Sequence, residues 1–143
     1  MTVEQLYQYA EDHSIEVDEY PMQRAKSLSV RLPDGNCSVA IDRSRIGNQC
    51  EMVVVIGHEL GHCSTMSFYS MSASQLEKKR DENRADKWAI KKLVPKDELE
   101  NLITHGTTEV LEIADYFNVT PEFAYKAMWY YQNGNLAVER LSA

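Results

Sequence analysis

The chain has 143 residues, which is enough for one domain with a hydrophobic core and too few for two ordinary domains. Its net charge of -7 and its pI near 5.1 argue against a nucleic-acid-binding surface and against binding to anionic membranes. No apolar stretch approaches membrane-spanning length, and the N-terminus shows no basic region followed by an apolar one, as in a secretory signal. We therefore expect a cytoplasmic protein that does not enter a membrane.

The three cysteines, Cys37, Cys50 and Cys63, are an odd number and do not have the spacing of a disulfide framework. This pattern favours a reducing compartment. There the thiols would pack as small buried hydrophobic groups. We therefore expect free thiols.

The first third of the chain combines one helical pattern with several strand patterns. Residues 3–13 carry apolar side chains among polar ones, as a short amphipathic helix does. Residues 15–20, 27–32 and 37–41 are strand-like, and a strong turn signal over residues 33–36 separates the last two. These features predict a small antiparallel sheet near the N-terminus.

The rest of the chain is predicted to be helical. A helix over residues 46–63 follows from its length and from two histidines four residues apart, although residues 53–56 alone would also suit a buried strand. A loop rich in Ser and Met, residues 64–74, precedes a long helix over residues 75–94, which Pro95 ends. The segments expected after it are three shorter helices and a loosely held tail: 96–103, 108–117, 120–131, and the residues from Gln132 onwards. The fold class is therefore predicted to be α+β.

The most specific motif is His58-Glu59-Leu60-Gly61-His62. Residues four apart on a helix project from the same face, so His58 and His62 can present two imidazoles to one metal ion. Glu59 lies beside that pair, within reach of a metal-bound water. This His-Glu-x-x-His pattern is the signature of metalloproteases, and zinc is its usual metal.

A third ligand is predicted from the helical phase of residues 75–94. Glu82 falls at the centre of an apolar stripe on that helix, and Asp86 lies close to it. A carboxylate in such a stripe is costly unless a cation pairs with it. We therefore predict Glu82 as the third metal ligand, and Asp86 as the group that holds the far nitrogen of His58 or His62. The apolar residues of the stripe are Ala85, Ala89, Ile90 and Leu93.

Other interpretations of these residues stay open. The histidines and their glutamate would also suit a solvated helix surface, and Glu82 with Asp86 would suit an ion network with neighbouring basic side chains. A closed structural zinc site is disfavoured, because the one cysteine nearby, Cys63, faces closer to Glu59 than to the metal axis. Two histidines and one carboxylate also suit iron, so the sequence does not fix zinc over iron or manganese.

Three stretches of the sequence form a combined pattern: His-Glu-Leu-Gly-His at 58–62, Glu-Asn-Arg-Ala-Asp-Lys-Trp-Ala at 82–89 and Leu-Val-Pro at 93–95. In these stretches the chain resembles the ImmA/IrrE family of zinc metallopeptidases. The resemblance covers about residues 54–95 closely, and the segments outside that range are compatible with it. Members of the family are often encoded by phages and mobile elements, and many are similar to anti-repressors that cleave helix-turn-helix repressors.

The resemblance implies a zincin-like fold in which a small N-terminal sheet packs on an active-site helix bundle, followed by additional C-terminal helices, all in one domain over residues 1–143. It implies a gluzincin-type site with zinc bound by His58, His62 and Glu82. It also implies that Glu59 is the catalytic carboxylate and that the substrate is a helix-turn-helix repressor. Asp86 matches an Asn/Asp position of the family pattern. No motif marks a donor that stabilises the transition state, and the unplaced candidates are Tyr69, His105, Tyr125, Tyr130 and Tyr131.

Residues 108–131 look like a helix-turn-helix pair, with a small residue at Ala114 and a turn near residues 118–120. The second helix offers mainly one basic side chain, Lys126, among aromatic and apolar ones. Because the chain is also acidic, we expect a packing or repressor-docking role for this pair, not DNA binding. Two alternatives to a peptidase stay open at this point. One is a catalytically silent anti-repressor or regulatory binding module with a structural metal site, and the other is a DNA-binding regulator.

Overall fold

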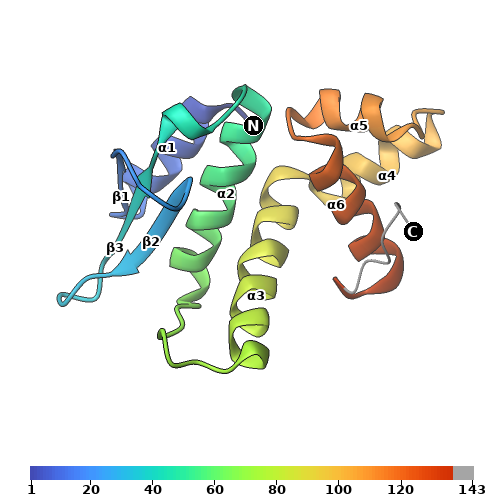
Figure 1. Ribbon diagram of the computed structural model, residues 1–143. Helices are drawn as coiled ribbons and strands as arrows, with labels where there is room; N and C mark the ends of the chain where they lie inside the picture. Colours follow the sequence, from blue (N-terminus) through green and yellow to red (C-terminus); the bar gives the residue numbers. More distant parts are fainter. Residues whose placement is uncertain (137–143) are drawn as a thin grey trace.

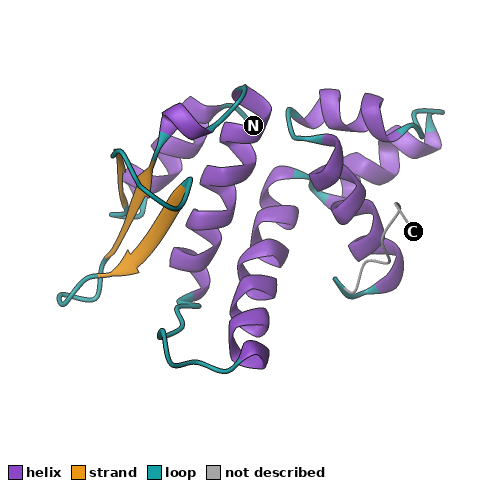
Figure 2. Cartoon of the chain, viewed as in Figure 1, coloured by secondary structure: helices purple, strands orange, loops and turns teal. Residues whose placement is uncertain are grey.

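The computed structural model describes residues 1–136. This part of the chain forms one helix, three strands and then five further α-helices (Figures 1 and 2). The predicted α+β class is confirmed. Among the described residues, every helix is too short or too polar to cross a membrane.

The sheet is mixed, with its strands in the order β1 (Glu16–Glu19), β3 (Cys37–Ile41) and β2 (Ser27–Arg31). The predicted hairpin is present, because β2 pairs antiparallel with β3. The prediction of an all-antiparallel sheet is wrong for β1, which pairs parallel with β3. The last residue of β1 and the first of β2 both pair with Ile41, from opposite sides of β3. The connection from β1 to β2 therefore crosses the end of β3. As a result, β1 and β3 run in the same direction and β2 runs in the opposite direction.

The central strand β3 supplies the inner face of the sheet, with Cys37, Val39 and Ile41 buried. That face packs against α2 (Gln49–Thr65), and α1 (Val3–Asp12) packs beside it (Figure 1). The helix α2 begins three residues later than predicted, because Asn48 caps its N-terminus, and a short 3-10 turn, η1 (Arg43–Arg45), precedes it. The residues 53–56, which also suited a strand, are helical.

The long helix α3 (Gln75–Leu93) returns alongside α2 (Figure 1). The predicted stripe of Ala85, Ala89, Ile90 and Leu93 is buried, so the helical phase is confirmed. The two helices approach closely at Gly61, where an added Cβ would collide with the backbone carbonyl of Ala85. A residue without a Cβ at position 61 therefore lets α3 bring its side chains up to α2.

Three shorter helices complete the described chain: α4 (Lys96–Thr104), α5 (Val110–Phe117) and α6 (Pro121–Asn133). The predicted turn between the last two is present, with Asn118 in the left-handed conformation and Thr120 capping α6. The tail predicted from Gln132 begins later, because Gln132 and Asn133 are the last residues of α6. Residues 137–143 of that tail lie outside the described residues. One cluster of buried apolar side chains joins α1, the sheet and all the later helices.

Candidate metal centre

The centre is built on consecutive turns of α2, where His58 and His62 point their rings toward each other. Their Nε2 atoms lie 3.1 Å apart. His62 is buried, with 7 % of its side chain exposed, and His58 is half-buried at 25 %. The predicted helical spacing of four residues therefore does bring two imidazole nitrogens together.

The carboxylate of Glu82 comes from α3 and meets both rings. Its Oε2 lies 2.8 Å from Nε2 of His58, and its Oε1 lies 3.2 Å from Nε2 of His62. The prediction that Glu82 joins the two histidines is confirmed, and the ligand atoms of the three residues lie within 4.8 Å of one another. Ligands about 2.0–2.1 Å from a tetrahedral zinc ion are roughly 3.3 Å apart, so these separations fit one shared ion. Nitrogen and oxygen donors of this kind can hold a divalent metal, without fixing which one.

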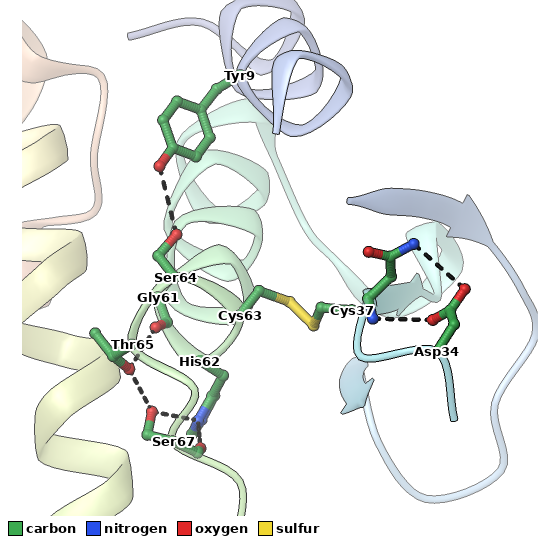
Figure 3. Close-up of a disulfide and its surroundings, with 10 residues drawn as sticks. Tyr9, Asp34, Cys37, Gly61, His62, Cys63, Ser64, Thr65 and Ser67 are labelled. Carbon is green, nitrogen blue, oxygen red and sulfur yellow. Dashed lines mark hydrogen bonds between the residues drawn. A yellow bond between two sulfur atoms is a disulfide. The ribbon is translucent and has the colours of Figure 1, made fainter. Parts of the chain in front are cut away.

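Both far nitrogens of the histidines are hydrogen-bonded. Nδ1 of His58 lies 2.8 Å from Oδ1 of Asp86, as predicted for that carboxylate. Nδ1 of His62 lies 2.6 Å from the backbone carbonyl oxygen of Ser67, a partner that the sequence did not reveal (Figure 3). When each Nδ1–H donates to its oxygen, each Nε2 presents its lone pair to the shared position.

The partner of His62 is local. The helix α2 ends at Thr65, and the left-handed conformation of the next residue, Met66, turns the chain back so that the Ser67 amide donates to the carbonyl of His62. This turn also aims the Ser67 carbonyl at the imidazole ring. A left-handed non-glycine residue gives no clear signal in a sequence, so this contact could not be predicted.

The protonation of His58 and His62 and the charge of Glu82 depend on one another. Burial opposes a charge on His58, but hydrogen bonds to Asp86 and Glu82 outweigh it and raise the pKa of the imidazole to about 10. Hydrogen bonds from His58 and His62 hold the pKa of Glu82 well below its usual value. Without a metal, protons on the histidines therefore provide the positive charge that the carboxylate faces. A metal ion would displace these protons, so its binding is coupled to pH.

Glu59, the predicted catalytic carboxylate, is buried beside this cluster. It receives a hydrogen bond from the hydroxyl of Ser27, on strand β2. Glu59 and the three clustered residues line one cavity of about 350 Å³, between the sheet edge and the loop after α2. The other residues that line it are Ser27, Leu28, Ser29, Ser67, Phe68 and Tyr69.

The sequence offered several candidates for a donor that stabilises the transition state. Of these, Tyr69 is the one that lines the cavity. Its hydroxyl donates to Oε1 of Glu82 over 2.9 Å. Two other candidates are engaged elsewhere, because the Tyr131 hydroxyl donates to the Val94 carbonyl and the His105 ring contacts the carbonyl of Asn101. Among the residues that line the described cavity, Tyr69 therefore carries the phenol, and its hydroxyl is hydrogen-bonded to Glu82.

Cys37 and Cys63 form a disulfide, with Cα atoms 5.6 Å apart (Figure 3). The expectation of free thiols is therefore wrong for this pair, and Cys50 is the free thiol of the described chain. The pairing arises because α2 packs on β3, a tertiary contact that the spacing of the cysteines does not encode. The bond fixes the turn of α2 next to His62 to the central strand.

Asp86, the carboxylate beside His58, also has a basic partner. Lys126 of α6 places Nζ 3.0 Å from Oδ2 of Asp86. The only sequence signal for this contact was an isolated basic residue in an aromatic helix. Forty residues separate the two side chains, so helical periodicity could not pair them.

No family model matches the sequence, and a comparison with curated proteins found no match. The interpretation of the centre therefore depends on its geometry and on the motifs described above.

Proposed function

We propose that this chain is a zinc-dependent endopeptidase with a zincin-like fold of the ImmA/IrrE type. The observation that supports it best is that His58, His62 and Glu82 converge in the same cavity as Glu59. Three protein ligands would hold zinc and leave one position open, as catalytic zinc sites do. When bound, zinc would supply the Lewis acidity that activates a water molecule and polarises a peptide carbonyl.

The residues of the chain would perform the proton transfers. Glu59 would accept the proton of the attacking water and pass it to the leaving amine, as a general base and then a general acid. Ser27 donates to one oxygen of that carboxylate, and both residues line the cavity. The hydroxyl of Tyr69 would exchange its hydrogen bond to Glu82 for one to the substrate's carbonyl oxygen as negative charge develops on that oxygen.

The sheet edge indicates how a substrate would bind. Within residues 1–136, strand β2 pairs with β3 on one side only, and three of its residues line the cavity. An extended peptide could add to the free edge through backbone hydrogen bonds, with Leu28 exposed to contact an apolar side chain. Such binding suits a protein segment that is unfolded at the cleavage site.

The resemblance suggests which protein would be cut. We propose a helix-turn-helix transcriptional repressor as the substrate, and an anti-repressor role for the enzyme. Such a target places the enzyme in the cytoplasm, where the Cys37–Cys63 bond would have to persist against cellular thiol reductants. The described chain offers no membrane-spanning helix, and its acidic balance disfavours direct binding to nucleic acid.

The test is the Glu59→Gln variant, with Glu98→Gln on α4 as a matched control at an exposed site. Zinc content is measured by elemental analysis, and cleavage is measured by mass spectrometry on a proteome-derived peptide library and on purified helix-turn-helix repressors, including any that is encoded beside this gene. Glu59→Gln should keep zinc and stop cleavage, whereas the control should keep both.

Two outcomes would contradict the proposal. Undiminished cleavage by Glu59→Gln would reject this carboxylate as the base. A wild-type protein that forms a tight complex with the repressor but cuts nothing would instead be a silent binding module.

A further inference from the structure

A chain of polar contacts links three helices across the metal centre. It starts at Lys126 of α6, whose Nζ lies 3.0 Å from Oδ2 of Asp86 on α3. The other oxygen of that carboxylate, Oδ1, lies 2.8 Å from Nδ1 of His58 on α2. Asp86 therefore bridges a cation and an imidazole, and each of its oxygens has one partner.

The burial of these groups makes the contact with Lys126 consequential. The side chain of Asp86 is 17 % exposed, against 38 % for Lys126. A carboxylate that is largely removed from water requires a compensating charge or hydrogen bonds. In the metal-bound state His58 must be neutral, because its Nε2 lone pair is given to the ion. The positive side chain that still faces Asp86 in that state is Lys126.

The overall charge of the centre leads to the same conclusion. Three carboxylates, from Glu59, Glu82 and Asp86, lie in or beside the cluster. One divalent ion balances two of them, and Lys126 would balance the third. The carboxylate of Asp86 can then act as a hydrogen-bond acceptor for His58 without leaving an uncompensated buried charge.

This contact also accounts for the basic residue of the helix-turn-helix-like pair. Lys126 is the only Lys or Arg in α6. The side chain that would have to contact a phosphate in a DNA-binding helix is engaged with Asp86. The pair α5–α6 therefore contributes its one such charge to a contact within this protein.

We propose that Lys126 is a positioning residue of the metal centre, which fixes Asp86 so that Asp86 holds the ring of His58. The C-terminal helix α6 would then help to orient a ligand of the metal ion. This inference rests on the metal binding of the proposed function, and it does not require peptidase activity.

The experiment compares Lys126→Met and Lys126→Arg with the wild type and with Lys91→Met, an exposed lysine on α3 that serves as the control. Zinc affinity is measured by competition with a chromophoric chelator, and the ligand geometry is followed by the visible spectrum of the Co²⁺-loaded protein. Loss of a group that orients a metal ligand typically weakens binding about 10- to 100-fold, and we expect Lys126→Met to fall near the lower end. Lys126→Arg should restore most of the affinity, and Lys91→Met should leave the affinity and the spectrum unchanged.

A double-mutant cycle with Asp86→Asn distinguishes positioning from a general effect of charge. If Lys126 acts through Asp86, then Lys126→Met should have no further effect on zinc affinity in the Asp86→Asn background. Circular dichroism of the metal-free variants checks folding. If Lys126→Met does not fold, Lys126→Gln takes its place in the cycle.

The outcomes separate the two proposals. A wild-type protein that binds neither zinc nor Co²⁺ removes the proposed function, and this inference with it. A wild type that binds zinc, combined with unchanged or higher affinity in Lys126→Met, removes this inference alone. An equal loss in both backgrounds of the cycle also overturns it, because the lysine would then act independently of Asp86.

Discussion

The two histidines of the candidate centre are held by different parts of the molecule. His62 contacts a neutral backbone carbonyl from Ser67, five residues later, at the turn that ends α2. His58 contacts the carboxylate of Asp86 on another helix, and a third helix supplies Lys126 to that carboxylate. The support of His62 is local and uncharged, whereas the support of His58 is charged and depends on tertiary packing. A carboxylate partner also makes an imidazole a more basic ligand. The centre should therefore be more sensitive to changes on the α3 and α6 side than to changes in the loop.

The largest expected effect comes from Glu82→Gln, because Glu82 contacts both histidines. This substitution replaces an anionic ligand with a neutral amide and should abolish stoichiometric zinc binding. Elemental analysis after dialysis against metal-free buffer measures it. The control is Glu77→Gln, an exposed residue on the same helix, which should retain zinc. Full zinc content in Glu82→Gln would show that the two histidines bind without this carboxylate.

The residues of the centre that could be predicted from the sequence are those set by local periodicity. The spacing of His58 and His62 and the phase of Glu82 on its helix both follow from 3.6 residues per turn. Lys126 and the carbonyl of Ser67 could not be predicted, because one depends on helix packing over forty residues and the other on a left-handed turn.

The same distinction applies to the fold. Helices, strands and the hairpin followed from patterns within short windows of sequence. The parallel pairing of β1 with β3 and the disulfide between Cys37 and Cys63 are contacts between separate elements. No periodicity within either element specifies such a contact. The helical phase of α3 was predictable because its buried stripe is a property of that helix alone.

The disulfide adds a covalent support on the His62 side of the centre, because Cys63 directly follows that histidine in the sequence. The bond closes a loop with a sequence separation of 26 residues, for which chain entropy predicts a stabilisation of about 3.5 kcal/mol. The double variant Cys37→Ala/Cys63→Ala should lose about that much in urea unfolding, as should the wild type treated with a dithiol reductant. Cys50→Ala, at the free thiol, is the control and should unfold like the wild type. A thiol count of three in the purified, unreduced protein would contradict the bond.

The pH dependence of the metal-free protein tests the charged support of His58. Its pKa is raised from 6.5 to about 10, so the protonated ring stabilises the fold fully below pH 6.5 and loses this effect as the pH rises toward 10. We expect the free energy of unfolding to fall across this window, by on the order of 2 kcal/mol after allowance for partial exposure. The measurement is urea unfolding of metal-free protein at several pH values. His58→Gln should flatten the profile more than His62→Gln, because His58 faces two carboxylates and His62 faces one. Equal slopes in both variants would contradict the comparison.

The comparison is tested most directly by Asp86→Asn, which keeps a side chain of the same size next to His58. The amide oxygen can still accept from Nδ1, but the negative charge and the ion pair with Lys126 are lost. Zinc affinity should fall about 10- to 100-fold, measured by chelator competition. An exposed acid, Asp12→Asn on α1, is the matched control and should bind zinc as the wild type does.

The smallest effect is expected from Ser67→Ala, on the side of the local support. The hydroxyl of Ser67 lies 3.3 Å from Nδ1 of His62, but the closer partner is the backbone carbonyl, which alanine keeps. The hydroxyl also contacts Thr65, so its removal should lower the stability of the loop by about 1 kcal/mol without freeing the imidazole. Zinc affinity should therefore change less than about threefold, far less than in Asp86→Asn. A loss in Ser67→Ala as large as that in Asp86→Asn would mean that the side chain, and not the helix-ending turn, holds His62. In that case the two histidines would be supported by side chains of equal importance.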